Sequence, residues 1–317
     1  YKERKINTTM ENTRAKTTRN SLILLLTATI WGMAFVSQSK GMDYMHPFTF
    51  NGVRSLIGAA GILVYILISR KIAGDKAAKL DWKLNVRAGL LCGIFLTIAS
   101  TLQQFGIKYT SVGKAGFITT LYIIFVPMFG IFLKKKVAPV VWAAAGMAAV
   151  GMYLLCMTES LRLGAGDIMV FLCAIAFAIQ IMTVDHYAAR IDGAVVSCIQ
   201  FTVCGVVCCI GALIWGQPTF GQIQEGLGAL LYAGVLSCGV GYTLQIVGQK
   251  GLNPTVAALI MSLESVIATI SGWIAYKIGF LSTDQTLTPR QIAGCIIVFA
   301  AVILVQLPPE WFRFGKK

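Results

Sequence analysis

The chain has 317 residues, of which 56% are apolar and only 13% are charged, and its mean hydropathy is +0.74. A soluble domain carries about 25% charged residues, so this composition excludes an ordinary water-soluble globule. The net charge of +14 does not require a nucleic-acid partner, because anionic lipid headgroups suffice to attract it.

Ten long apolar runs follow one another along the chain, each close to the ~20 residues that cross a bilayer as a helix. They cover residues 21–39, 48–69, 84–107, 112–133, 137–157, 167–185, 194–215, 226–247, 254–276 and 289–307. Because the runs are continuous rather than alternating, they exclude a membrane β-barrel. The sequence therefore predicts an all-α polytopic membrane protein with ten transmembrane helices.

The first apolar run follows residues 1–19, a polar and basic stretch that we expect to be a disordered tail. The run exceeds the ~7–15 residues of a secretory signal core, and no clear A-x-A cleavage site follows it. We therefore interpret it as a retained transmembrane helix, with Met10 as a second candidate for the first residue.

Lys and Arg are distributed unevenly among the segments that connect the runs. Arg54 lies inside a run, and six of the 27 fall on one side of the expected membrane: Lys40, Lys108, Lys114, Arg162, Lys277 and Arg290. The other 20 fall on the opposite side. Since cytoplasmic segments carry the excess of Lys and Arg, both termini are predicted to face the cytoplasm.

Two nearly identical octapeptides stand far apart in the chain, TLQQFGIK at 101–108 and TLQIVGQK at 243–250. The same offset of 142 positions aligns a further set of residues, Ala115, Ile118, Leu121, Gly130 and Lys135 with Ala257, Ile260, Leu263, Gly272 and Lys277. Upstream the offset slips by a few residues, so that Trp31-Gly32 aligns with Phe177-Ala178 and Arg54 with Gln200. The expected organisation is a tail over 1–19, one five-helix unit over 20–158, a second over 164–307, and a cytoplasmic tail over 308–317.

A unit with five spans begins and ends on opposite sides of the membrane, so its copy is inserted upside down. This predicts a 5+5 inverted repeat. Such repeats are typical of alternating-access transporters, in which a central site lies between the halves.

Several motifs together resemble the EamA family of the drug/metabolite transporter superfamily. They are Trp31-Gly32, Arg54 early in the second run, YTSVGKAGFITTLYIIFVP at the fourth and LNPTVAALIMSLESVIA at the ninth. The chain departs from the family at Ser265, where many members have Pro, and at 134–136, where a Gly-Glu pair often stands. The resemblance implies a transporter of small metabolites, such as amino acids, nucleotide precursors, sugars or cationic toxins, in the bacterial cytoplasmic membrane.

Glu264 is the most informative single residue, because a charged side chain near the middle of a span costs about 2.5–3.5 kcal/mol. It is a candidate proton-binding group or a counter-charge for a cationic substrate. The structural alternative is a protonated carboxyl that hydrogen-bonds to a neighbouring helix. Tyr122 occupies the repeat-equivalent position, so we expect the two to face each other across the cavity.

The other candidate substrate-binding residues are Arg54, Gln103, Gln245, Trp31 and Tyr242. Arg54 either snorkels to the headgroups or anchors a substrate carboxylate. Gln103 and Gln245 should lie beside the pseudo-two-fold axis. Trp31, Tyr122, Tyr242 and Trp273 could form an aromatic wall for a cation, although Trp273 also suits a bilayer edge.

Two further residues suggest how the helices move. Lys114 begins the fourth run and is expected either to snorkel or to form a gate contact. Pro127 in the same run is a candidate hinge, and its repeat-equivalent, Thr269, predicts no matching hinge in the other half.

Motifs for enzymes, ATP hydrolysis, cofactors and metals are absent: no GxxxxGK[ST], GxSxG or HExxH occurs, and no CxxC is present among the nine cysteines. We therefore expect a secondary active transporter of small polar metabolites, either an amino-acid exporter or an exchanger, with Glu264 as a possible site of proton coupling. The alternatives are a carrier of a cation such as choline or a cationic drug, and a transport-inactive sensor or scaffold. Its partners would be the metabolite and the lipid bilayer, and it would act as a monomer or a homodimer.

Overall fold

The computed structural model describes residues 2–74, 80–134, 137–156, 164–282 and 284–306, and within these ranges it contains helices and no β-strand. Some of the sequence-based expectations fall outside the described residues. They are the ends of two runs at 157 and 307, the boundary at 158, the tail over 308–317, and Lys76, Lys79, Lys135, Lys136, Arg162, Arg313, Lys316 and Lys317.

Six elements make up the first half of the described chain: α1 (Lys2–Gly41), α2 (Pro47–Ala73), α3 (Trp82–Ile107), α4 (Val112–Thr120), α5 (Tyr122–Phe132) and α6 (Pro139–Cys156). The second half contains α7 (Ala165–Tyr187), α8 (Gly193–Gly211), the π-helix η2 (Ala212–Gly216), α9 (Phe220–Glu225), α10 (Leu227–Leu231), the π-helix η3 (Tyr232–Gly241), α11 (Tyr242–Gln249), α12 (Pro254–Met261), α13 (Glu264–Lys277) and α14 (Pro289–Gln306).

Eight helical stretches of the described chain are long and apolar enough to cross a membrane. They match the first four predicted runs and the sixth to the ninth. The fifth and tenth runs correspond to α6 and α14, whose described apolar parts, Pro139–Gly151 and Pro289–Leu304, are shorter.

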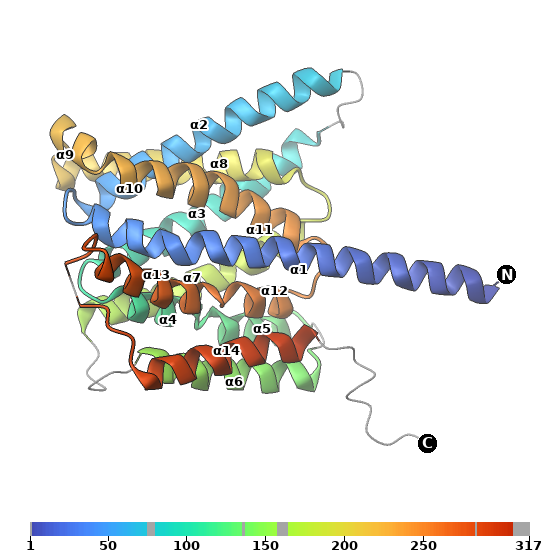
Figure 1. Cartoon of the computed structure of the whole chain (residues 1–317). Helices are drawn as coiled ribbons and strands as arrows, with labels where there is room; N and C mark the ends of the chain where they lie inside the picture. The colour runs from blue at the N-terminus through green and yellow to red at the C-terminus, as the bar shows by residue number, and fades with distance from the viewer. Residues whose placement is uncertain (1, 75–79, 135–136, 157–163, 283, 307–317) are drawn as a thin grey trace.

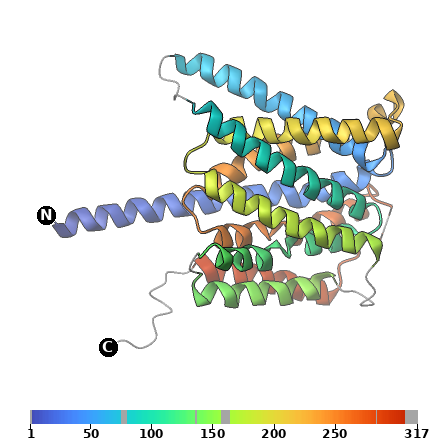
Figure 2. The same ribbon diagram turned by 180° about the vertical axis from the view of Figure 1, so that it is seen from behind.

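The first helix is longer than its apolar run, because α1 begins at Lys2 and contains 40 residues. The expectation of a disordered stretch is therefore wrong for 2–19. The physical reason is that no Pro or Gly interrupts the chain before Gly32. At 1.5 Å per residue α1 is about 60 Å long, roughly twice a hydrocarbon core of about 30 Å, and its first half projects from the bundle (Figures 1 and 2).

The helices begin at polar caps that the sequence supplies between the apolar runs. His46, Asp81, Ser111, Asp192 and Asn253 each accept a hydrogen bond from a backbone N–H in the first turn of α2, α3, α4, α8 and α12. These caps satisfy donors that a helix cannot satisfy internally. They fix where each helix starts and hence the depth of the residues that follow.

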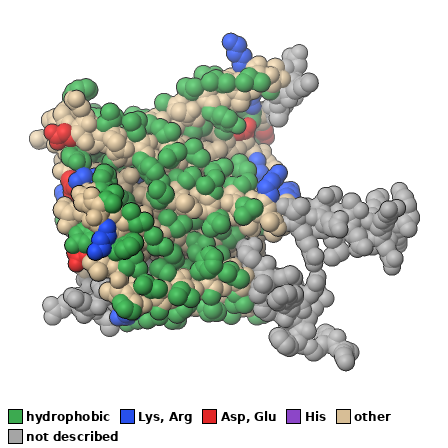
Figure 3. Space-filling view, viewed as in Figure 1, with side chains coloured by type: hydrophobic (Ala, Val, Ile, Leu, Met, Phe, Trp, Pro, Cys, Tyr) green, Lys and Arg blue, Asp and Glu red, His purple; other side chains and the backbone are tan. Residues whose placement is uncertain are grey.

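The helices lie side by side in alternating directions, and α1 begins at the same end of the bundle where α14 finishes (Figures 1 and 2). We call this the basic end, since Arg70, Lys71, Lys83, Arg87, Arg190 and Lys250 lie there. The opposite, far end holds His46, Lys108 and Lys114. Apolar side chains cover most of the face between the two ends, and charged ones gather at the ends (Figure 3).

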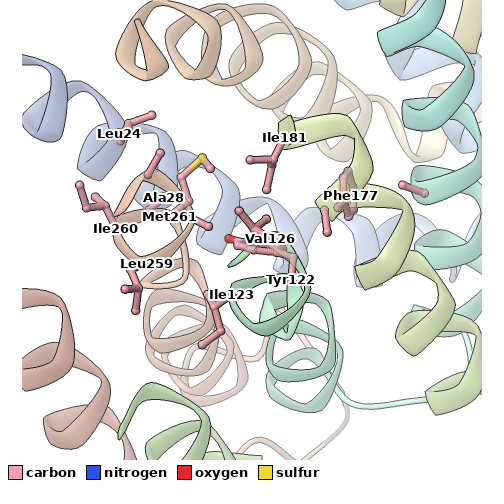
Figure 4. Packing of buried hydrophobic residues seen from close by; sticks show 14 of the residues in the cluster. Leu24, Ala28, Tyr122, Ile123, Val126, Phe177, Ile181, Leu259, Ile260 and Met261 are labelled. Carbon is pink, nitrogen blue, oxygen red and sulfur yellow. The ribbon is translucent and has the colours of Figure 1, made fainter. Parts of the chain in front are cut away.

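The two halves pack on each other through matching helices. Helix α3 packs against α7, and η3 and α11 pack against α1; α2 packs against α8, and α6 against α14. The core between the halves contains Leu24, Ala28, Tyr122, Ile123, Val126, Phe177, Ile181, Leu259, Ile260 and Met261 (Figure 4). The centre of the molecule is therefore an interface between the two halves.

The repeated octapeptides lie at these contacts. A Cβ on Gly106 would stand 2.8 Å from the carbonyl oxygen of Gly166 in α7, so only glycine fits. A Cβ on the matching Gly248 would stand 2.7 Å from Leu24 Cδ2 and 3.2 Å from the carbonyl oxygen of Asn20, both in α1. Each octapeptide thus brings its helix close to the first helix of the opposite half.

Candidate functional site

A cavity lies at the centre of the bundle, between the two halves. Its lining consists of Trp31, Phe35, Gln38, Arg54, Ser55, Leu96, Ser100, Gln103, Thr119, Tyr122, Phe177, Gln180, Ile181, Phe201, Ser237, Cys238, Tyr242, Gln245 and Glu264. The space that a water molecule can occupy there is about 30 Å³. Ligand pockets usually enclose about 300–1,000 Å³, so this conformation is closed down around its centre.

All seven candidate substrate-binding residues line this one cavity: Trp31, Arg54, Gln103, Tyr122, Tyr242, Gln245 and Glu264. Trp273 and Lys114 do not line it. The structure thus collects, from six different helices, the polar and aromatic residues that the sequence singled out.

Two broken helices position Tyr122 and Glu264. The break between α4 and α5 falls at Leu121, whose N–H donates to the carbonyl of Ile118 (3.2 Å), three residues back. In the break between α12 and α13, the N–H of Leu263 donates to Ile260 (3.3 Å) in the same way. Tyr122 and Glu264 are the first residues after these breaks.

A hydroxyl group supports each break from the preceding position. Thr120 Oγ1 donates to the carbonyl of Phe117 (2.8 Å), and Ser262 Oγ donates to that of Leu259 (2.7 Å). Such bonds compete with the regular helix and bend it. Pro127 lies inside α5, beyond the break, and the hinge expected there stays a prediction. The structure adds a pair of matched breaks, one in each half.

Glu264 is 4% exposed and meets Tyr122 inside the cavity. The phenolic O–H of Tyr122 donates to Glu264 Oε1 over 3.0 Å. Lys40 forms an ion pair with Asp43 and Lys114 forms one with Asp167, and neither pair includes Glu264 or Arg54. The carboxyl group therefore has a hydrogen-bond donor beside it and no cation within ion-pair distance among the described residues.

Arg54 is 5% exposed and also lines the cavity, so it does not snorkel to the headgroups. Its guanidinium carbon lies 5.4 Å from the centroid of the Phe50 ring. Its Nε–H finds no hydrogen-bond acceptor in the described structure. A buried guanidinium with an unpaired donor is ready to bind a planar anion such as a carboxylate.

Aromatic rings form one side of the cavity. The centroids of Trp31 and Tyr242 are 4.5 Å apart, and those of Tyr242 and Phe201 are 5.0 Å apart at 83°. Trp31 Nε1–H donates to the carbonyl of Ser237 (3.4 Å) in the π-helix η3. Gly241 permits this approach, since a Cβ there would stand 2.7 Å from Trp31 Nε1.

The amides of the cavity bond to one another and to a hydroxyl. Gln245 Nε2–H donates to Gln180 Oε1 (3.1 Å), and Gln180 Nε2–H returns a longer bond to Gln245 Oε1 (3.5 Å). In the other half, Gln103 Nε2–H donates to Thr119 Oγ1 (3.2 Å). These side chains can exchange such bonds for bonds to a polar ligand.

The lining residues fall largely into pairs related by the repeat. An offset of 146 positions relates Trp31 to Phe177, Phe35 to Ile181 and Ser55 to Phe201. The offset of 142 relates Leu96 to Cys238, Ser100 to Tyr242, Gln103 to Gln245 and Tyr122 to Glu264. Eight of these fourteen residues were not among the candidates, including Phe35, Ser55 and Ser100. Steps of one residue or one helical turn from Trp31, Arg54 and Gln103 would have found these three.

Contacts of different chemistry close the two ends of the bundle. At the far end, Lys114 Nζ and Thr110 Oγ1 donate to the carboxylate of Asp167 over 2.7 and 2.9 Å. Lys114 therefore pairs with α7, and its role as a gate stays a prediction. At the basic end, Asn20 Nδ2–H donates to the carbonyl of Lys250 over 2.7 Å. The far end is thus held by an ion pair, and the basic end by a neutral hydrogen bond.

In the described parts of the chain, no group of three or more His, Cys, Asp or Glu side chains could hold a metal ion. The described cysteines are free thiols.

Comparisons with known proteins agree on one family. The model of the EamA-like transporter family matches residues 19–157 and 164–307. An uncharacterized transporter of Archaeoglobus fulgidus is 27% identical over 90% of this chain and 84% of its own length. The uncharacterized transporter YwfM of Bacillus subtilis is 24% identical over 92% of this chain and 94% of its own length. One protein crystal structure, 16% identical, shares the fold with a TM-score of 0.72 over 94% of this chain and 99% of that one.

Proposed function

Because the chain belongs to the EamA-like transporter family and is an integral protein of the plasma membrane, we propose that it carries small zwitterionic metabolites, with amino acids as the leading class. It exports or exchanges them by alternating access, using the central cavity as its binding site. The observation that supports this proposal most directly is that the closed cavity contains a carboxyl group, Glu264, and a guanidinium cation, Arg54. The two are not paired with each other.

The two charges match the two ends of an amino acid. Arg54 offers its free Nε–H to a carboxylate. Glu264, beside the rings of Trp31 and Tyr242, offers a counter-charge to an ammonium group. A site with opposite charges on its wall rejects ligands that carry only one of them, because the other buried charge then stays unpaired.

Magnitudes support a role for Glu264 beyond packing. An interhelical hydrogen bond such as that from Tyr122 contributes about 0.6–2 kcal/mol, whereas a carboxylate at mid-depth costs about 2.5–3.5 kcal/mol. The hydrogen bond does not offset this cost. Glu264 needs a further partner, which is the substrate ammonium in the loaded carrier and a proton in the empty one, so that transport is coupled to proton movement.

The repeat supports the mechanism. Matching helix breaks, matching cavity residues and the exchanged packing of α3 on α7 and of α11 on α1 are what a 5+5 inverted repeat requires. We propose ten spans with both termini in the cytoplasm, so that the basic end faces inward. Each half can then adopt the arrangement of the other, which opens the cavity to one side at a time.

The test is a thermal-shift measurement on purified protein with three matched ligand classes: amino acids, their N-acylated forms and their amides. A ligand that binds only the folded state raises the melting temperature. We expect a rise with the zwitterions alone, and Arg54→Gln should abolish it while leaving the melting temperature of the unliganded protein nearly unchanged. A rise of equal size with the N-acylated forms would contradict the role of Glu264.

The aromatic wall favours a second candidate, a carrier of cations such as choline or a cationic drug. In that case a quaternary ammonium compound without a carboxylate would raise the melting temperature, and Arg54→Gln would leave this rise intact. A transport-inactive sensor would bind a ligand yet show no counterflow of it in proteoliposomes.

A further inference from the structure

A second hollow lies at the basic end, away from the central cavity. It encloses about 620 Å³ between the last turns of α2, the turn between α7 and α8, and the end of α11. We call it the basic crevice and define it by Arg70, Arg190 and Lys250 around its mouth and by Tyr65, Ile66 and Val247 along its walls. None of these residues lines the central cavity.

The charge of the crevice is positive in effect, although two acidic residues also line it. Asp81 Oδ1 accepts the N–H of Leu84, and Asp192 Oδ1 accepts the N–H groups of Ala194 and Val195. Both carboxylates are therefore occupied as helix caps, where the helix dipole already balances them. Among the cations, Lys250 is only partly engaged: its Nζ donates one hydrogen bond, to the carbonyl of Ile191 (3.2 Å), and keeps two donors.

The part of the crevice wall formed by Tyr65, Ile66 and Val247 is largely apolar, while Ser69, Asn85 and Thr243 add polar groups. Helix α2 diverges from the bundle toward its C-terminal end (Figure 1). Tyr65 is 61% exposed and contributes to the wall, while Leu67 and Ile68 are similarly exposed on the same turns. Exposed apolar side chains on a membrane helix beside cationic ones offer a surface for an acyl chain next to its headgroup.

We propose that the basic crevice binds one anionic phospholipid, with its phosphate between Arg190 and Lys250 near Arg70 and an acyl chain along α2. Cationic pockets between membrane helices recognise anionic headgroups in this way. The volume and the apolar wall favour a lipid over a free phosphate ion, which would leave most of the space empty. The phosphate would also join the α7–α8 turn to α11, two elements that the structure already links through Lys250 and Ile191.

Native mass spectrometry of the detergent-purified full chain tests this proposal. Phosphatidylglycerol is titrated against the wild type and against Arg190→Gln/Lys250→Gln, with phosphatidylcholine as the neutral lipid. At about 1 kcal/mol per cation, losing both charges should weaken phosphatidylglycerol binding about thirtyfold. The backbone carbonyl of Lys250 that accepts from Asn20 is unchanged in this variant, and a melting curve verifies the fold.

The matched control is Lys71→Gln/Lys83→Gln, which removes two exposed cations at the same end that do not line the crevice. It should bind phosphatidylglycerol like the wild type. An equal loss in the control, equal binding of phosphatidylcholine, or full competition by millimolar inorganic phosphate would each overturn the proposal. The readout involves no flux, so it stands or falls separately from the proposed transport function.

Discussion

In the first half of the molecule the helix break carries Tyr122 and the second helix carries Arg54; in the second half the matching positions carry Glu264 and Gln200. The two halves therefore have the same helix breaks at matching positions, but they carry different charges there. Matching breaks give both ends of the bundle the same means of bending. The unmatched charges give the cavity one acidic and one basic wall, so a bound ligand has a defined orientation.

The halves also differ in helix regularity. Helix α3 runs as an α-helix from Trp82 to Ile107, while the corresponding stretch of the second half is built from α10, the π-helix η3 and α11. The π-helix presents the carbonyl of Ser237 to Trp31. Irregular helices of this kind often occur at functional sites. The irregular stretch of the second half therefore holds one member of the aromatic wall in place.

The largest expected effect comes from removing the charge at one break. Glu264→Gln should lower substrate counterflow in proteoliposomes at least about thirtyfold, because an unpaired buried partner costs about 2–5 kcal/mol. Tyr122→Phe, at the matching position, should lower it only about threefold, since it removes one interhelical hydrogen bond. Equal losses in the two variants would mean that the breaks are functionally equivalent.

An intermediate effect is expected at the two closures. Asp167→Asn weakens the ion pair with Lys114 and should speed the labelling of Cys238, which lines the cavity, about tenfold from the far side. Asn20→Ala should speed labelling from the basic side about fivefold, since it removes a neutral hydrogen bond. Peptide mass spectrometry after treatment with an impermeant thiol reagent separates Cys238 from the other thiols. Equal acceleration from both sides in either variant would contradict separate closures.

The smallest effect concerns the caps of α2 and α8, which occupy matching positions. Burial and the nearby charge of Lys108 lower the pKa of His46, whose neutral Nδ1 accepts the N–H of Phe48. The folded state then binds a proton less readily than the unfolded state, so stability is full above pH 6.5 and falls as the pH drops below it. His46→Asp, which copies Asp192, should remove this loss of up to about 1 kcal/mol. Melting curves between pH 5 and about pH 8 measure it; an unchanged pH dependence would contradict the assignment.

The sequence was sufficient for eight of the ten predicted spans and for much of the cavity, because both depend on local signals. Apolar length predicts a membrane helix, and a charge or amide within such a helix must face the protein interior. Glu264, Arg54, Gln103 and Gln245 were found in this way.

What the sequence could not predict depends on contacts between distant helices. Leu96 and Phe201 are apolar residues in apolar helices, and they line the cavity because their helices meet there. Asp167 stands at the start of an apolar run, where a surface position is expected. In the structure its carboxylate is buried and forms an ion pair with Lys114. The two helix breaks were missed, because the hydroxyl bonds of Thr120 and Ser262 become visible only in three dimensions.

The two breaks have a consequence for how the membrane stays sealed. Helix α4 packs against α13 toward the far end, and α5 packs against α12 toward the basic end, so the four segments form two pairs that meet at mid-depth. In the alternating access that we propose, each pair would move about the joints at Leu121 and Leu263 while the other pair stays in place. One end of the bundle would then open while the other stays closed, so that no ion passes through during a transport cycle.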